Sequence, residues 1–305
     1  MKITVHGIGR TGSALAYTLM LKGVCEELCL VSRNADKARG ECYDLRHATC
    51  SNTRPTRITH GDLDASADSD LIALCASIPT PTDMSDRSVL ARGNGALFRK
   101  LIPELARRSP NAVLVIVSNP VDALTHLSID LSGFPWQRVI GAGTLVDSLR
   151  FRGLLSDEVG IHPHDLRAYI LGEHGRTQFP AFASAEVGGE PIEQNAKRDA
   201  MFDEARDSAF AVFRAKGHTS YAIASAAAYI IEAIAYDTKR VVPVSVRVDG
   251  FHGITDVCLS LPVVLGRTGI QRILRPTLNP QEVAQLRAAA DAIRDTLHDC
   301  TDPSP

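Results

Sequence analysis

The sequence feature that most constrains the fold is a glycine pattern close to the start of the chain. Gly7-Ile8-Gly9-Arg10-Thr11-Gly12 follows the strand-like run Lys2 to His6 and precedes an apolar run, Ser13 to Lys22, that has no helix breaker. At such a strand-to-helix turn the first glycine makes the tight turn, the second lets backbone approach a pyrophosphate, and the third lets helix and strand pack closely. The helix N-terminus then offers unpaired N–H groups to the phosphates. The pattern predicts a dinucleotide site that includes Gly7, Gly9, Arg10, Thr11 and Gly12.

Strand-like and helix-like segments alternate through the first half of the chain. The run from Val113 to Val117 is continuously apolar, as in strands that a parallel sheet buries on both faces. Repeated βαβ units with right-handed crossovers predict a doubly wound parallel sheet of the Rossmann type. The other predicted strands are Leu28 to Ser32 and Leu71 to Ala76, and the predicted helices are Asp36 to Ala48 and Val89 to Arg107.

The pattern changes after about residue 145. Two strand pairs are predicted there, Arg167 to Leu171 with Ala181 to Val187, and Val241 to Val248 with Val257 to Leu265, before a long final helix from Pro280 to Cys300. This mixture is typical of an α+β arrangement. We therefore expect a dinucleotide-binding domain over residues 1–143 and a catalytic, substrate-binding domain over residues 144–305.

The end of the second predicted strand bears on the choice of cofactor. An NAD enzyme carries Asp or Glu there for the ribose hydroxyls, about twenty residues past the glycine loop. This chain has Ser32, Arg33 and Asn34, with Lys37 one helical turn further on. A carboxylate would repel a 2′-phosphate, whereas a hydroxyl beside a guanidinium would bind it. The residues favour NADP(H) over NAD(H), although Ser32 is compatible with either cofactor and Arg33 could simply point to water.

Composition and charge exclude several classes of function. The formal net charge is −2 at pH 7, so the chain lacks the basic excess of a nucleic-acid binder. The most apolar long stretch, Ala222 to Tyr236, contains Glu232 and is too short to span a bilayer. The chain starts with strand-like residues, so we expect a cytoplasmic protein without a membrane partner. The seven cysteines show no metal-binding spacing, so no metal is expected.

Four further clusters complete the pattern, namely Asp86-Arg87-Ser88, Ser118-Asn119-Pro120, Asp147-Ser148-Leu149-Arg150 and Gly172-Glu173-His174-Gly175. Together with the glycine loop, these clusters resemble the L-lactate/malate dehydrogenase family over nearly the full length. Val117 to Asp122, Gly133 to Pro135, Arg138 to Gly141 and Lys216 to Thr219 match that family in order and spacing. The resemblance implies a 2-hydroxy acid dehydrogenase that uses a nicotinamide cofactor.

The chemistry of such a reaction explains the residue types. Reducing a ketone by hydride requires a proton for its oxygen, and a histidine, which titrates near neutral pH, serves both directions. By resemblance this residue is His174, with Asp147 holding its other ring nitrogen. Arg150, on the same helix face as Asp147, is expected to bind the substrate carboxylate through two parallel hydrogen bonds.

The resemblance also assigns the surrounding positions. Arg87 is expected on a loop that closes over the site and polarises the carbonyl group. Asn119 is expected to hold the reacting oxygen and to position the nicotinamide, and Thr219 to line the substrate pocket.

The sequence departs from the family where substrate choice is set. Malate enzymes place a second arginine before Arg87 and lactate enzymes usually a glutamine, whereas residues 77–86 contain no cation and Pro81 lies at or beside the discriminating position. Because an unpaired carboxylate near Asp83 would be costly, oxaloacetate should be a poor substrate. Arg176 stands where lactate enzymes typically carry Asp, and His218 and His252 are further polar substitutions. We expect a small 2-oxo acid with a polar or charged tail that Arg176 meets, unless Arg176 pairs with a carboxylate across a subunit contact.

Two alternative functions and the state of assembly stay open from the sequence. The chain could be an L-lactate dehydrogenase proper, or a catalytically silent dinucleotide sensor, although a sensor has no need of His174. Family resemblance implies a homodimer or homotetramer, and the apolar helix Ala222 to Ala235 could lie at such a contact or in the core.

Overall fold

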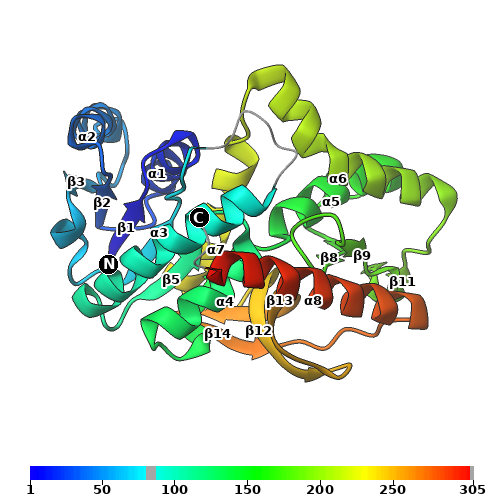
Figure 1. Cartoon of the computed structure of the whole chain (residues 1–305). Coiled ribbons are helices and arrows are strands. Elements are labelled where there is room, and N and C mark those ends of the chain that lie inside the picture. Colours follow the sequence, from blue (N-terminus) through cyan, green and yellow to red (C-terminus); the bar gives the residue numbers. More distant parts are fainter. Residues whose placement is uncertain (80–86, 303–305) are drawn as a thin grey trace.

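The first half of the chain forms the predicted parallel sheet. The computed structural model describes residues 1–79 and 87–302, and Figure 1 shows their arrangement. Within them the strands of this half run parallel in the order β3-β2-β1-β4-β5-β6, which confirms the doubly wound Rossmann-type architecture. The elements are β1 (Lys2–His6), α1 (Arg10–Lys22), β2 (Glu27–Val31), α2 (Ala35–Thr49), β3 (Arg57–Gly61), a 3-10 turn (Leu63–Ser66), β4 (Leu71–Leu74), α3 (Arg87–Arg108), β5 (Val113–Ile116), α4 (Val121–Ser132), a 3-10 turn (Trp136–Arg138) and β6 (Val139–Gly141).

The second half is the predicted mixture of helices and antiparallel strands, but part of it continues the same sheet. Strand β12 pairs antiparallel with β6, and β13 and β14 follow outward, so the sheet order ends β14-β13-β12-β6. Two small sheets, β11-β10-β7 and β8-β9, stand apart. The elements are α5 (Leu145–Val159), β7 (Leu166–Arg167), β8 (Ile170–Leu171), β9 (Phe179–Pro180), a 3-10 turn (Phe182–Ser184), β10 (Glu186–Val187), β11 (Glu190–Pro191), α6 (Ala196–Lys216), α7 (Tyr221–Ala235), β12 (Val241–Phe251), β13 (Ile254–Gly266), β14 (Gly269–Ile273) and α8 (Pro280–Thr301).

The first predicted strand pair is wrong in detail. The segment from Arg167 to Leu171 was expected to be one strand, but it divides into β7, which pairs with β10, and β8, which pairs with β9. The 3-10 turn Phe182–Ser184 separates the two partner strands. Each short strand therefore belongs to a different small sheet, and the loop after β8 is free to carry His174.

Alternate residues of the central strands bury their side chains on opposite faces of the sheet. Val5 on β1 and Ala73 on β4 belong to the core under α1, α2 and α7, whereas Ile72 and Leu74 on β4 belong to the core under α3, α4 and α8. In Figure 1 the red helix α8 runs past α3 and α4, against which it packs. Helix α7 packs on α1 and β13 with most of its residues buried, so the apolar helix lies in the core of the single chain. No helix among the described residues is both long and apolar enough to cross a membrane.

The sheet places one site by its topology. From β1 the chain winds outward through β2 and β3, and from β4 it winds the other way through β5 and β6. Doubly wound sheets bind ligands where this direction reverses, beyond the carboxyl ends of the strands. The glycine loop that follows β1 and the segment that follows β4 meet at this reversal.

Candidate active site

The glycine loop has the shape that its sequence predicts. Gly7 has a φ of +99°, and a Cβ there would lie 2.3 Å from the backbone nitrogen of Ala76. A Cβ on Gly12 would lie 2.1 Å from the carbonyl oxygen of Gly7, whereas one on Gly9 would meet nothing within 4 Å. The first and third glycines therefore permit the turn and the close packing. The second borders open space.

The open space lies at the N-terminus of α1. Gly9 caps the helix without a side-chain hydrogen bond, and the first turn contains no acidic residue. The first N–H groups of α1 and its partial positive charge are thus available to an anion. A dinucleotide pyrophosphate fits this arrangement, and Gly9, Arg10 and Thr11 are the residues that would surround it.

Arg10 and Thr11 also connect the glycine loop to the second half of the chain. The Arg10 guanidinium donates to the carbonyl oxygen of Gly217 at 3.3 Å, and the Thr11 hydroxyl donates to that of Thr219 at 3.5 Å. The junction of α6 and α7, with Thr219, therefore lies beside the predicted phosphate site. His218 is in the same junction, whereas His252 lies in the turn between β12 and β13 against the ring of Phe251.

The residues after β2 have local roles as well. The Ser32 hydroxyl accepts the N–H of Asn34 at 3.2 Å, and the Asn34 side chain accepts the N–H of Lys37 at 2.9 Å as the N-cap of α2. The Asn34 side chain is thus occupied by the helix that it caps. Ser32 is half-buried and Arg33 is exposed, so the guanidinium is accessible at the end of the strand.

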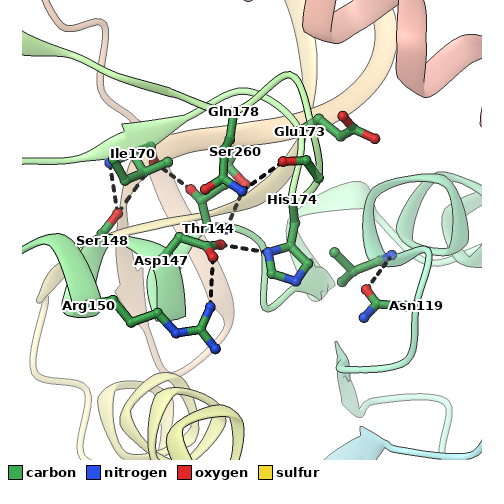
Figure 2. A network of polar contacts seen from close by, with 12 residues as sticks. Asn119, Thr144, Asp147, Ser148, Arg150, Ile170, Glu173, His174, Gln178 and Ser260 are labelled. Carbon is green, nitrogen blue, oxygen red and sulfur yellow. Dashed lines mark hydrogen bonds and ion pairs between the residues drawn. The ribbon is translucent and has the colours of Figure 1, made fainter. Parts of the chain in front are cut away.

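The imidazole, the carboxylate and one of the two guanidinium groups of the predicted constellation come together. Asp147 Oδ2 lies 2.6 Å from His174 Nδ1, and Asp147 Oδ1 accepts a hydrogen bond from Arg150 at 3.0 Å. Figure 2 shows Asp147 between the two cationic side chains. The Asp147 side chain is 3% exposed, whereas those of His174 and Arg150 are 23% and 17% exposed.

The outer edges of both cationic groups are open to a ligand. Within the described part of the chain, His174 Nε2 has no hydrogen-bond partner, and Arg150 makes no side-chain bond other than the one to Asp147. Arg150 therefore keeps several N–H donors for a carboxylate, and His174 keeps the nitrogen that faces away from Asp147.

The charges of this cluster stabilise one another. Burial alone would lower the pKa of His174, but the facing Asp147 carboxylate outweighs burial and raises it. Burial alone would raise the pKa of Asp147, but the His174 imidazole and the Arg150 guanidinium lower it. The proton that Asp147 helps His174 to hold can therefore be given up at Nε2, because Nδ1 is held by the carboxylate.

Backbone contacts with β13 fix the elements that carry these groups. Ser260 exchanges backbone hydrogen bonds with Gly172 at 3.2 and 2.8 Å, two residues before His174. Its hydroxyl accepts the N–H of Thr144 at 3.0 Å, three residues before Asp147. One residue of the central sheet thus holds the start of α5 and the His174 loop together.

Asn119 is an exposed residue held by its backbone, and its side-chain oxygen accepts the N–H of Val121 at 3.3 Å. Its carbonyl oxygen accepts a hydrogen bond from Asn94 at 2.7 Å, and Asn94 also accepts the N–H of Ile78 at 2.8 Å. In the view of Figure 2, Asn119 lies on the opposite side of the His174 ring from Asp147. Asn94 is fully buried on α3; a lone Asn between apolar helix positions was the only signal that might have identified it.

A second buried carboxylate was also missed. Asp122 lies in the first turn of α4, three residues after Asn119. It is 4% exposed and accepts the backbone N–H of His174 at 2.7 Å. The sequence shows it only as an acidic residue in the first helical turn, which is a common and usually solvated position.

The remaining predicted positions lie at or beyond the described residues. Pro81 lies outside them, and Arg87 begins α3 with its side chain outside them. Arg176 is exposed two residues after His174, and no carboxylate of the described ranges lies within ion-pair distance of it. Three of the four groups of the predicted constellation thus converge, and the structure does not describe the fourth.

Comparisons with known families and proteins agree with this geometry. The family profile described as lactate/malate dehydrogenase, NAD binding domain, matches residues 1–141, and that of the alpha/beta C-terminal domain matches residues 144–302. An L-lactate dehydrogenase of Acetivibrio thermocellus is 37% identical over 97% of this chain and 96% of its own length. L-lactate dehydrogenase A of Hordeum vulgare is 41% identical over 96% of this chain and 85% of its own length.

A solved structure of another protein has nearly the same fold as this chain. The crystal structure of a lactate dehydrogenase from a deep-sea metagenome library has a TM-score of 0.94 and 31% identity, with 99% of each chain covered. Sequence and structure thus indicate a lactate dehydrogenase-like oxidoreductase with a nicotinamide dinucleotide cofactor. The chain belongs to the lactate/malate dehydrogenase family.

Proposed function

We propose that the chain interconverts a small 2-oxo acid and the corresponding 2-hydroxy acid, with His174 as the acid–base residue. The single observation that carries this proposal is the position of Asp147, which holds His174 Nδ1 at 2.6 Å and Arg150 at 3.0 Å. A proton donor and a carboxylate-binding guanidinium are thereby fixed side by side, which matches a substrate whose reacting oxygen is next to its carboxylate.

The roles of the residues follow from this arrangement. The bound nicotinamide would supply or accept the hydride at the substrate C2. His174 Nε2 gives a proton to the oxygen as the ketone is reduced and takes it back in the reverse direction. Asp147 stabilises the imidazolium and orients the ring, and Arg150 binds the substrate carboxylate through its remaining donors. Asn119 and Arg87 complete the surroundings of the reacting oxygen, with Thr219 at the pocket wall.

Replacing His174 by Asn tests the acid–base role. The variant should lose at least about a hundredfold in kcat, the lower range for general acid–base catalysis, while cofactor affinity measured by nicotinamide fluorescence stays within a few-fold. Retained turnover would remove His174 from the mechanism. A wild-type protein that binds the dinucleotide but reduces no 2-oxo acid would instead indicate a sensor.

We also propose that NADP(H) is preferred to NAD(H). No carboxylate stands at the end of β2 where a ribose diol would be bound, and Arg33 is exposed there beside the Ser32 hydroxyl. The first acidic residue after Ser32 in the chain, Asp36, forms an ion pair with Arg39 at 2.8 Å. The name of the family profile points to NAD, so the ratio of kcat/KM for NADPH and NADH must be measured directly. Ser32→Asp should shift that ratio toward NADH, and an unchanged ratio would refute this interpretation.

For the substrate, we propose a 2-oxo acid with a polar or anionic tail in place of oxaloacetate or pyruvate. Residues 77–86 contain no cation, and the exposed Arg176 guanidinium follows His174 by two residues, where it would meet such a tail. Pyruvate is the second candidate because the similar proteins are named L-lactate dehydrogenases. A panel of 2-oxo acids with both reduced cofactors decides between them, and the tail hypothesis fails if pyruvate is turned over as efficiently as any other acid.

Assembly and location are two further proposals. Exposed aromatic and aliphatic side chains on α1 and α2, namely Tyr17, Leu21 and Tyr43, suit a contact between subunits. We therefore propose a homodimer or homotetramer, which light scattering on the purified protein would test. A cytoplasmic location remains a prediction from the sequence.

A further inference from the structure

Asp122 contacts the backbone of the proposed acid–base residue, whereas Asp147 contacts its ring. Its Oδ2 accepts the backbone N–H of His174 at 2.7 Å, and its side chain is almost fully buried at the start of α4. His174 is therefore held by two aspartates, one at its ring and one at its backbone.

No residue of the described ranges forms an ion pair with the Asp122 carboxylate. Its Oδ1 is buried and has no hydrogen-bond partner among the described residues. The Ser245 hydroxyl on β12 faces the carboxyl group without closing a full hydrogen bond, and the neutral thiol of Cys258 on β13 and the carboxylate of Glu173 lie near it. Burial raises the pKa of Asp122 to about 6.

A neutral side chain could make the same backbone contact at lower cost. An asparagine carbonyl also accepts an N–H group, and it avoids the cost of burying a carboxylate without a partner. The positive group that faces the Asp122 carboxylate is the imidazolium of His174, which its charge favours. The charge of Asp122, and not only its hydrogen bond, thus acts on His174.

We propose that Asp122 is a positioning residue for His174 that fixes the loop backbone and, when ionised, favours the protonated imidazole by its charge. The inference rests on the acid–base role proposed for His174. The other groups that face His174 are Asp147 and Arg150 on α5. Glu173, in the same loop as His174, acts on Asp122.

The proposal has a signature that a purely structural role lacks. Reduction of the 2-oxo acid needs protonated His174, and oxidation of the 2-hydroxy acid needs the neutral form. Removing the Asp122 charge should therefore move the His174 limb of both pH profiles to lower pH. At a fixed pH on that limb, kcat/KM should fall for reduction and rise for oxidation. A loosened loop would instead lower both.

Asp122→Asn is the main variant, because the side chain keeps its shape and an acceptor. We expect its limb to move by about half a pH unit to one unit, less than a directly facing charge produces, with about a two- to tenfold change in kcat/KM on the limb. Asp130→Asn is the matched control: it removes a charge from the same helix at a side chain that is 57% exposed, and its profile should coincide with that of the wild type.

The outcomes separate the two proposals. If the wild type is active and the pH profile of Asp122→Asn coincides with that of the wild type, only the role of Asp122 is refuted. If the wild type shows no turnover, both the proposed function and this inference are refuted. Should Asp122→Asn fail to fold, Ser245→Ala carries the test, since the hydroxyl favours the charged form of Asp122. Its limb should move in the same direction by less, and an unmoved limb overturns the proposal.

Discussion

Replacing Asp147 by Asn should cost this enzyme most of its activity without unfolding it. The substitution preserves the shape of a side chain that is 3% exposed and lies 2.6 Å from His174 Nδ1 and 3.0 Å from Arg150. It removes the charge that outweighs burial at His174. Burial then dominates, so the imidazole loses its proton at a lower pH. The carboxamide can also donate to Nδ1 and so select the wrong tautomer.

The size of the loss follows from the contacts. A hydrogen bond to a charged group contributes about 1.5–3 kcal/mol, and about 1.4 kcal/mol corresponds to one pH unit in a titration midpoint. The limb of the pH profile for reduction should move about one to two pH units lower. On that limb the protonated fraction falls about 10- to 100-fold, and misplacement of the ring adds to this, so we expect a total loss of about 10²- to 10⁴-fold in kcat/KM.

The assay is steady-state nicotinamide absorbance with the best 2-oxo acid of the panel, measured across pH for wild type and Asp147→Asn. Circular dichroism and thermal melting verify that the variant is folded. A variant within threefold of wild type at neutral pH, with an unmoved limb, would show that the carboxylate does not support the proton donor.

Three further predictions use other contacts of the site. Arg150→Lys replaces a planar two-point donor by a point charge, so KM for the 2-oxo acid should rise about 10- to 100-fold with cofactor affinity unchanged; an equal loss in cofactor binding would contradict a substrate role. Gly9→Ala adds a methyl group into open space and should weaken dinucleotide binding at a nearly constant melting temperature. In Gly12→Ala the added methyl group would lie 2.1 Å from a carbonyl oxygen, so this variant should be destabilised by about 1–3 kcal/mol. The difference in unfolding free energy between wild type and Asp147→Asn should be largest between about pH 4 and 6.5, where both partners are charged in the folded and unfolded chains. This difference should shrink as pH falls through the lowered pKa of Asp147 and as pH rises through the raised pKa of His174. If urea titrations show the same difference at every pH, the ion pair is refuted.

The sequence predicted those elements whose local pattern is strong. The apolar run Val113 to Val117 became β5, buried on both faces, and the glycine loop formed as expected after β1. The strands β3, β6 and β14 of the large sheet were not predicted. Strand β6 has only three residues, too few to show a pattern. Strands β3 and β14 are edge strands with one neighbour each, and in β3 only Ile58 is buried. Because an edge strand buries little apolar surface, its sequence does not need the apolar pattern by which a buried strand is recognised.

The candidate site was predictable only in part, for a related reason. Residue types with a known chemistry, such as His174 and Arg150, could be picked out of the chain by family order. Supporting contacts could not: Asp122 and His174 are 52 residues apart, and Asn94 joins Asn119 across 25 residues. Such bonds depend on which backbone groups the tertiary fold leaves unpaired, and a single sequence does not encode that locally.

The seam between the two halves explains how scattered residues reach a common point. The sequence predicted a boundary near residue 143 from a change of pattern, and the structure has a continuous sheet there, with β12 against β6 through Ser245 and Gly141. A Cβ on Gly143 would lie 2.4 Å from the Ser260 hydroxyl, so only glycine lets the chain pass β12 and β13 this closely. Ser260 can then bind the backbone at both Thr144 and Gly172. Backbone hydrogen bonds to the continuous sheet therefore fix the start of α5, which carries Asp147, and the loop that carries His174 in one arrangement.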